Sequence, residues 1–181
     1  MNTALLLIDI QKDYFVGGKN ELANTAQCLA HTEQALSWFR EKHLPIIYIQ
    51  HISLQADATF FLPNSEGINI HEQIAPRANE KVIIKHFPDS FYNTGLNEHL
   101  AALGINHLVI CGMMSHMCID TTVRSAKRLG YNVSLLSDAC TTKALVWNNE
   151  TIPAETVHKT FMASLQGTFA NVIDTHALTN R

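Results

Sequence analysis

Short, almost continuously apolar runs alternate along the chain with segments of helical periodicity, and this alternation constrains the fold more than any other feature. The runs that predict strands are residues 4–8, 46–50, 81–85, 107–111, 132–137 and a short sixth at 172–173, and helices are expected over 24–42, 94–103, 119–129 and 153–165. Strands that are apolar on both faces are typical of parallel sheets covered by helices on each side. The pattern therefore predicts one three-layer, Rossmann-like α/β domain over residues 1–181, with a mostly parallel six-stranded sheet.

Local signals predict where several of these elements begin and end. Asn24 and Gln27 resemble a capping pair at the start of the first helix, and Pro153 suits the first turn of the last one. Gly112 is expected to break the fourth strand. Residues 51–79 and 138–152 show no convincing periodicity, and the first of these segments has the length of a functional loop or lid.

The segment that follows the fourth strand predicts a cysteine at the start of a helix. Gly112 separates the strand from residues 119–129, which have helical periodicity, and Ser115 is expected to cap that helix. Cys118 then lies in the first turn, where unpaired N–H groups and the helix dipole favour a negative charge. This position predicts a lowered thiol pKa and a nucleophilic thiolate.

Two charged residues end other predicted strands. Asp9 follows the run at residues 4–8, and Lys85 ends the run at 81–85. A charge there is costly unless it is paired or functional, and the carboxyl ends of parallel strands border the binding crevice in open α/β sheets. Asp9, Lys85 and Cys118 are therefore expected to meet at one edge, as a carboxylate, an ammonium and a thiol suited to nucleophilic catalysis.

The chain resembles the isochorismatase-like cysteine hydrolase superfamily, which includes nicotinamidases and N-carbamoylsarcosine amidase. The matching stretches are residues 7–11 with Phe15, Lys85 with Phe91, residues 112–126 and residues 136–140, in the order that the family shows. The resemblance covers roughly residues 4–145. It implies a Rossmann-like three-layer fold and a hydrolase that acts on a small amide or a related C–N bond.

In that family a cysteine attacks the carbonyl, and an aspartate moves the proton from the thiol to the leaving amine. Carried onto this chain, the resemblance implies that Cys118 is the nucleophile, Asp9 the acid/base and Lys85 the stabilising cation. It also implies a cis bond between Met113 and Met114, with the N–H groups of Met114 and Cys118 as the oxyanion hole. Isochorismatase itself cleaves a vinyl ether without a cysteine nucleophile, so Cys118 favours amide hydrolysis.

Several residues are candidates for the substrate pocket, and no cofactor is expected. The candidates are Gln11, Phe15, Phe60, Phe61, Phe91, His116 and Trp147, each of which could equally be ordinary packing. Nicotinamidases hold a metal with an Asp-x-His pair after the second strand, but here that position reads Ile49-Gln50-His51. His71 and His86 define no ligand set with it, so we expect no catalytic metal.

The net charge and the cysteine content limit the possible binding partners and the expected location of the protein. The net charge of −3 and the lack of long basic runs argue against nucleic acid as a partner, and no apolar stretch approaches the roughly 20 residues of a membrane span. The cysteines other than Cys118 are Cys28, Cys111 and Cys140; the first two are expected in the core, and the third near the crevice. No C-x-x-C pair or signal peptide is recognised, so we expect reduced thiols in the cytoplasm. The family resemblance also implies a homodimer or a larger homo-oligomer.

A second class of function is compatible with the same cysteine. A reactive thiol in a redox sensor, or in a small-molecule-binding protein without turnover, would also use Cys118 and Lys85. Such a protein has no use for Asp9 as a proton carrier. The role of Asp9 therefore distinguishes a hydrolase from a sensor.

Overall fold

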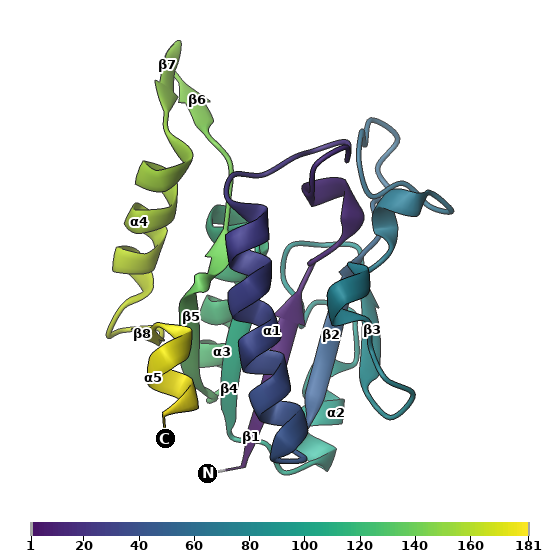
Figure 1. Ribbon diagram of the computed structural model, residues 1–181, viewed down its shortest axis with the longest axis vertical. Helices are drawn as coiled ribbons and strands as arrows, with labels where there is room; N and C mark the ends of the chain where they lie inside the picture. The colour runs from purple at the N-terminus through teal and green to yellow at the C-terminus, as the bar shows by residue number, and fades with distance from the viewer. Residues whose placement is uncertain (1, 181) are drawn as a thin grey trace.

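A six-stranded parallel sheet forms the middle layer of the computed structural model, which describes residues 2–180 (Figure 1). Its strand order is β3-β2-β1-β4-β5-β8, and a separate antiparallel hairpin pairs β6 with β7. The strands are β1 (Thr3–Ile8), β2 (Ile46–His51), β3 (Lys81–Lys85), β4 (His107–Met113), β5 (Asn132–Thr141), β6 (Leu145–Trp147), β7 (Glu150–Ile152) and β8 (Asn171–Ile173). The predicted three-layer α/β fold and its parallel sheet are confirmed.

Five α-helices and four short turns of other helix types complete the fold. The α-helices are α1 (Thr25–Glu41), α2 (Leu96–Ala102), α3 (Asp120–Arg128), α4 (Ala154–Leu165) and α5 (Thr175–Thr179), and the short turns are η1 (Lys12–Tyr14), η2 (Glu66–Ile68), η3 (Glu72–Ile74) and η4 (Ser115–Ile119). Helices α1 and α5 lie in front of the sheet in Figure 1, whereas α2 and α3 lie behind it. Among residues 2–180, no helix has both the length and the apolar character that crossing a bilayer would require.

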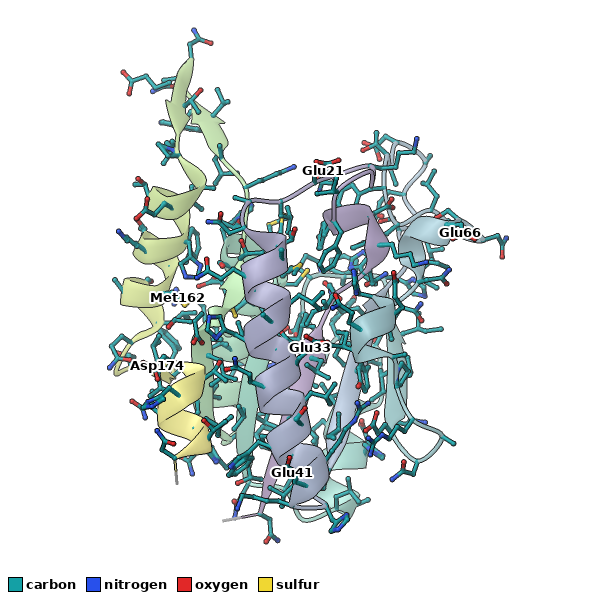
Figure 2. All side chains as sticks on the ribbon, in the orientation of Figure 1. Glu21, Glu33, Glu41, Glu66, Met162 and Asp174 are labelled. Atoms are coloured by element: carbon teal, nitrogen blue, oxygen red, sulfur yellow. The ribbon has the colours of Figure 1, made fainter. Side chains whose placement is uncertain are left out.

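The core lies where the central strands meet the two helical layers. Residues 4–8 of β1 are buried along their whole length, because β1 has a strand on each side and helices over both faces. Helix α1 packs on the sheet with its buried side chains Leu29, Ala35, Leu36 and Phe39. Charged side chains such as Glu41 and Glu66 lie at the periphery of the molecule (Figure 2). Burial on both faces explains why these strands read as continuous apolar runs.

Two predicted helix starts differ from the structure. Asn24 precedes α1 in a left-handed conformation with a φ of 53°, and its side chain makes no capping hydrogen bond. A capping residue normally has an extended backbone, so the predicted capping pair with Gln27 is wrong. Pro153 also lies outside its helix, with a ψ of 147°, and immediately precedes α4.

Gly112 does not break the fourth strand, as the sequence suggested, but lies inside β4 and pairs with Ile8 of β1. Its φ is +130°, and a Cβ built there would overlap the carbonyl oxygen of Ile8. The glycine therefore permits a close approach of the two central strands. The register of β4 against β5 shifts between Ile110 and Gly112. Gly112 therefore lies opposite Cys140, and β5 continues to Thr141.

The long segment at residues 51–79 is tied to the turn that follows β1. The Gln11 amide accepts a hydrogen bond from the N–H of His51 at 2.7 Å and donates to the carbonyls of His51 and Ile68 at 2.8 and 2.9 Å. The Asp13 carboxylate accepts hydrogen bonds from the N–H groups of Phe61 at 2.6 Å and Lys19 at 3.1 Å. These bonds, with η2 and η3, give the segment a defined path beside the carboxyl ends of β1 and β2.

Replacing Gly112 with alanine should destabilise the fold far more than the same change at Gly130. Both glycines have a positive φ, of +130° and +94°, but only at Gly112 does an added Cβ meet backbone within 4 Å. Gly130→Ala should cost about 1–2 kcal/mol of unfolding free energy through its backbone conformation alone. Gly112→Ala should cost more than about 4 kcal/mol or prevent folding. Urea denaturation followed by circular dichroism measures both, and equal losses would contradict the close approach of β1 and β4.

Candidate active site

Asp9, Lys85 and Cys118 come together at the carboxyl edge of the sheet. Lys85 Nζ lies 2.8 Å from Asp9 Oδ2 and 3.1 Å from Cys118 Sγ. All three side chains are buried, and even Cys118 is only 5% exposed. A buried ammonium is tolerated because these partners and the carbonyl of Phe87, at 3.0 Å, surround it. The structure thus brings the three predicted catalytic residues into contact.

Each of these residues is positioned by the end of a strand or the start of a helix. Asp9 directly follows β1 with a φ of +53°, and its N–H donates to the carbonyl of Ile49 at 3.0 Å. Lys85 is the last residue of β3. Cys118 lies in η4, a single π-helical turn in which the Ile119 N–H reaches the Met114 carbonyl at 3.2 Å. Because the strands are parallel, their carboxyl ends place all three groups at the same edge of the sheet.

His51 is a fourth member of the site that the sequence analysis did not assign to it. Its Nδ1 lies 3.0 Å from Lys85 Nζ. An ammonium only donates hydrogen bonds, so Nδ1 accepts and the ring proton is on Nε2. Burial lowers the pKa of His51 to about 4, with Asp9 raising it and Lys85 lowering it, which keeps the ring neutral at pH 7. Because His51 ends β2, the argument used for Asp9 and Lys85 would have found it.

The Cys118 thiol is protonated in the resting site. Burial raises its pKa, the charge of Asp9 raises it further, and Lys85 only partly opposes them. The predicted lowering of this pKa by the helix start is therefore wrong, because burial and the nearby carboxylate outweigh the helix terminus. Burial also acts to lower the pKa of Lys85, but the charge of Asp9, with the close contacts that Lys85 makes with Asp9 and Cys118, outweighs burial and raises this pKa. The site thus holds an ammonium beside a neutral thiol, with the Asp9 carboxylate available as proton acceptor.

Ser115 holds the nucleophile turn, although it does not cap α3 as predicted. Its hydroxyl donates to the carbonyl of Thr141 at 3.1 Å and lies 2.8 Å from Nδ1 of His158 in α4. His116 contacts the hydroxyl of Thr142 at 2.5 Å. The turn that carries Cys118 is therefore fastened to the end of β5 and to α4.

The peptide bond between Met113 and Met114 is cis. The resemblance implied this conformation, so that expectation is confirmed. The bond joins the last residue of β4 to the residue that precedes η4. Of the two proposed oxyanion-hole residues, Met114 precedes η4 and Cys118 lies within it.

The expected pocket residues differ in how they relate to this site. Phe61 is buried and stacks near His51, with ring centroids 5.9 Å apart, and Phe60 packs on Phe61. Gln11 is also close, but its amide is engaged by backbone groups. Trp147 is 71% exposed on the projecting β6–β7 hairpin (Figure 1).

Two further candidates pack against other aromatic rings. Phe15 packs against His71 with the rings tilted and their centroids 4.3 Å apart, and together they line a separate surface hollow of about 450 Å³. Phe91 stacks on Tyr131 at 5.8 Å. Cys28 and Cys111 are buried in the core as expected, and Cys140 is buried beside Gly112 with a pKa raised to about 12, mainly by burial.

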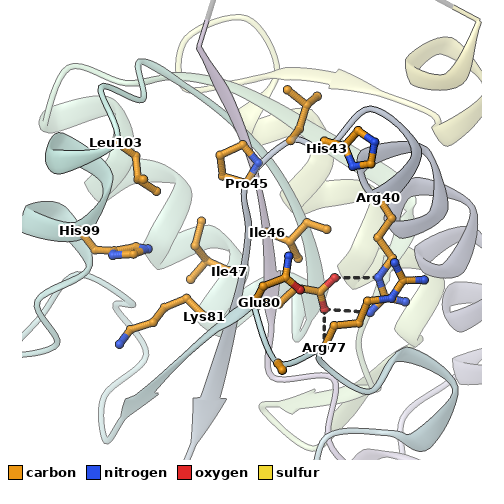
Figure 3. A pocket seen from close by; sticks show the side chains of 13 residues that line it. Arg40, His43, Pro45, Ile46, Ile47, Arg77, Glu80, Lys81, His99 and Leu103 are labelled. Carbon is orange, nitrogen blue, oxygen red and sulfur yellow. Dashed lines mark hydrogen bonds and ion pairs between the residues drawn. The ribbon is translucent and has the colours of Figure 1, made fainter.

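A second hollow lies at the opposite end of the sheet. It has a volume of about 490 Å³ and is lined by Pro45 and Ile46 at the start of β2 and by Lys81 at the start of β3. Figure 3 shows the Arg40–Glu80 pair on its wall, where Nε and Oε1 lie 2.7 Å apart. Parallel strands place their amino ends far from their carboxyl ends, so this hollow is separate from the catalytic edge.

Asp9, His51 and Cys118 are a possible metal-ligand set among the described residues. Their ligand atoms all lie within 4.8 Å of one another. The Lys85 ammonium, however, contacts all three side chains at 2.8, 3.0 and 3.1 Å. A divalent cation in the same place would meet strong repulsion from this ammonium. The lysine therefore supplies the positive charge that a metal would supply in such a set.

Comparison with known proteins agrees with the fold. The family model of the isochorismatase domain matches residues 3–177. An uncharacterized isochorismatase family protein, YddQ of Bacillus subtilis, is 49% identical over 98% of both chains. The crystal structure of a putative isochorismatase hydrolase from Oleispira antarctica has 41% identity and a TM-score of 0.96, and the match covers 99% of this chain and 97% of that one.

More distant relatives include a streptothricin hydrolase of Streptomyces noursei, 33% identical over 75% of this chain and 48% of its own length. A cysteine hydrolase from Pseudomonas syringae shares the fold, with a TM-score of 0.93 over 99% of this chain and 91% of that one, at 22% identity. The chain belongs to the isochorismatase family, and it is a hydrolase of that family.

Alkylation of Cys118 by iodoacetamide should be nearly independent of pH. Because the pKa of this thiol is raised, raising the pH from about 6.5 to 9 should not build up thiolate, and the proton should pass to Asp9 during reaction. The rate should change less than about twofold, whereas free cysteine, with a pKa of about 8.5, should react much faster at the higher pH. Peptide mass mapping should find Cys118 modified before the other cysteines. A rate that rises in parallel with that of free cysteine would contradict the protonated resting thiol.

Removing the Lys85 ammonium should create a zinc site. Lys85→Ala leaves the carboxylate, imidazole and thiol within 4.8 Å of one another with no internal cation. Isothermal titration should detect about one Zn²⁺ per chain in this variant and no comparable binding in the unmodified protein. The double variant Lys85→Ala/His51→Ala is the control and should lose that binding. Equal affinity of the unmodified protein would show that Lys85 does not exclude the metal.

Proposed function

We propose that the protein hydrolyses a small amide or a related C–N bond through an acyl-enzyme on Cys118. The observation that carries this proposal is the contact of one buried ammonium, Lys85 Nζ, with both Asp9 Oδ2 at 2.8 Å and Cys118 Sγ at 3.1 Å. A thiol next to an ionised carboxylate has a nucleophile and its base in one place. The relative named as a streptothricin hydrolase supports a hydrolytic reaction.

The first half of the reaction transfers the acyl group to sulfur. Asp9 takes the thiol proton as Cys118 Sγ bonds to the substrate carbonyl carbon, and Lys85 balances the negative charge that moves through the site. The carbonyl oxygen becomes an oxyanion, for which the N–H groups of Met114 and Cys118 are the proposed donors. The C–N bond then breaks, and Asp9 returns the proton to the departing amine.

Water completes the cycle. Asp9, ionised again, takes a proton from a water molecule that attacks the thioester carbonyl, and the C–S bond breaks. The sulfur leaves as a thiolate beside Lys85 and regains its proton from Asp9. Each cycle consumes one amide and one water and releases one amine or ammonia with one carboxylic acid. No cofactor enters this scheme.

The alternative of a reactive-thiol sensor is less well supported. A sensor thiol needs a low pKa and access to solvent, whereas burial raises the pKa of Cys118. Asp9 raises it further, which hinders a sensor but suits a hydrolase that needs a proton acceptor next to sulfur. A binding protein without turnover also gives no reason for a buried carboxylate in contact with the ammonium.

Asp9→Asn should abolish turnover without unfolding the protein. The amide is nearly isosteric with the carboxylate but cannot accept and return the proton, so kcat should fall by about a thousandfold or more. A panel of small amides, ureas and carbamoyl compounds, assayed for release of ammonia or amine, supplies the substrate. Asp138→Asn is the matched control, since Asp138 bonds Thr175 and does not contact Lys85 or Cys118. Activity of Asp9→Asn within tenfold of the unmodified protein would remove the acid/base role.

A further inference from the structure

The ammonium of Lys85 is surrounded by more acceptors than it has protons. Four groups lie within 3.1 Å of Nζ: Asp9 Oδ2 at 2.8 Å, His51 Nδ1 and the Phe87 carbonyl each at 3.0 Å, and Cys118 Sγ at 3.1 Å. An ammonium carries three N–H donors. One of the four neighbours is therefore left without a hydrogen bond of its own.

The neighbour left without a hydrogen bond is Asp9. The contacts of Lys85 with His51, Phe87 and Cys118 have the geometry of hydrogen bonds, and together they use its three N–H groups. The contact with Asp9 is a close ion pair, and both oxygens of this carboxylate are buried without a hydrogen-bond partner among residues 2–180. Leaving a buried acceptor unpaired costs free energy. The orientation of the ammonium is therefore set by its other three acceptors.

Among these three acceptors, His51 is held by hydrogen bonds from one side chain. Its backbone N–H donates to Gln11 Oε1 at 2.7 Å, and its carbonyl accepts from Gln11 Nε2 at 2.8 Å. Its ring lies beside that of Phe61, with centroids 5.9 Å apart. Burial lowers the pKa of His51 to about 4, so the ring is neutral at pH 7 and Nδ1 is able to accept. His51 therefore offers Lys85 an acceptor that is fixed in place and in protonation state.

We propose that His51 is a positioning residue, which holds one N–H of Lys85 so that the Asp9 carboxylate stays free to take the thiol proton. A second N–H of Lys85 then faces the sulfur of Cys118. An N–H that turned to the carboxylate would stabilise its ionised form and make it a poorer proton acceptor. The inference rests on the proposed function and adds to it a residue that acts through Lys85.

The test compares His51→Asn with His51→Leu, two side chains of nearly the same size and shape. Asparagine keeps an acceptor oxygen near the place of Nδ1, whereas leucine has none, and both variants lose the ring. The reaction is alkylation of Cys118 by iodoacetamide at neutral pH, in which an S–C bond forms, iodide leaves and the thiol proton passes to Asp9. His51→Leu should react about tenfold slower than the unmodified protein, and His51→Asn within about threefold of it, since a hydrogen bond to a charged group has an effect of this size.

His86→Asn and His86→Leu are the matched controls. His86 follows Lys85 in the chain, but its Nδ1 lies 2.7 Å from the carbonyl of Ile52. Both control variants should react at the rate of the unmodified protein. The melting temperatures of all four variants are measured, and a His51→Leu protein that melts like His51→Asn but reacts more slowly has lost the acceptor and not the packing. If His51→Leu does not fold, His51→Phe replaces it, because it keeps a ring beside Phe61 and lacks an acceptor.

Equal rates for His51→Asn and His51→Leu would overturn the proposal, whether both were slow or both were normal, because the acceptor would then have no effect. Faster alkylation of His51→Leu would also overturn it, since the released N–H would then have turned to the sulfur and not to Asp9. These outcomes are separate from the fate of the proposed function. Failure of every amide in the panel would count against hydrolysis, whereas the ratio of the two alkylation rates reports on His51 whether or not turnover occurs.

Discussion

The buried Lys85 ammonium is the interaction on which the arrangement of the site depends. It touches a carboxylate, a thiol and an imidazole within 3.1 Å, and the buried carboxylate would be costly without a cation beside it. The ammonium keeps the Asp9 carboxylate compensated, makes His51 a hydrogen-bond acceptor and faces the sulfur of Cys118. It also occupies the centre of what would otherwise be a metal-ligand set. The ammonium of a lysine side chain thus supplies the positive charge that a bound metal ion supplies in other sites.

The scaffold supports this cation by close packing of strands and turns. Gly112 allows β4 to approach β1 closely, so the nucleophile turn begins beside Asp9. Gln11 ties the turn after β1 to the segment that follows β2, and Ser115 ties the nucleophile turn to β5 and α4. The groups that react therefore sit on short backbone segments, each held by hydrogen bonds from residues that do not react.

Features that are decided by residues close together in the sequence were predicted correctly. Features that depend on residues far apart in the sequence were not. Lys81–Lys85 was found with correct bounds because a run of apolar residues between charges is decided locally. The pKa of Cys118 was predicted in the wrong direction because the helix terminus is local, whereas burial and the charge of Asp9 come from the folded chain. The β6–β7 hairpin that carries Trp147 was not predicted, because residues 138–152 show no clear periodicity in the sequence.

The sequence by itself determined the layered α/β architecture, because apolar runs and helical periodicity specify which faces must be buried. It also determined which charged residues end strands, and hence that Asp9 and Lys85 meet Cys118 at one edge. Only the tertiary structure decided the protonation of that site, since pKa values depend on burial and on charges brought close by folding. It likewise decided that His51 accepts from Lys85 and that Ser115 is a tether and not a cap. Such pairings are set by three-dimensional distance, which residue order does not contain.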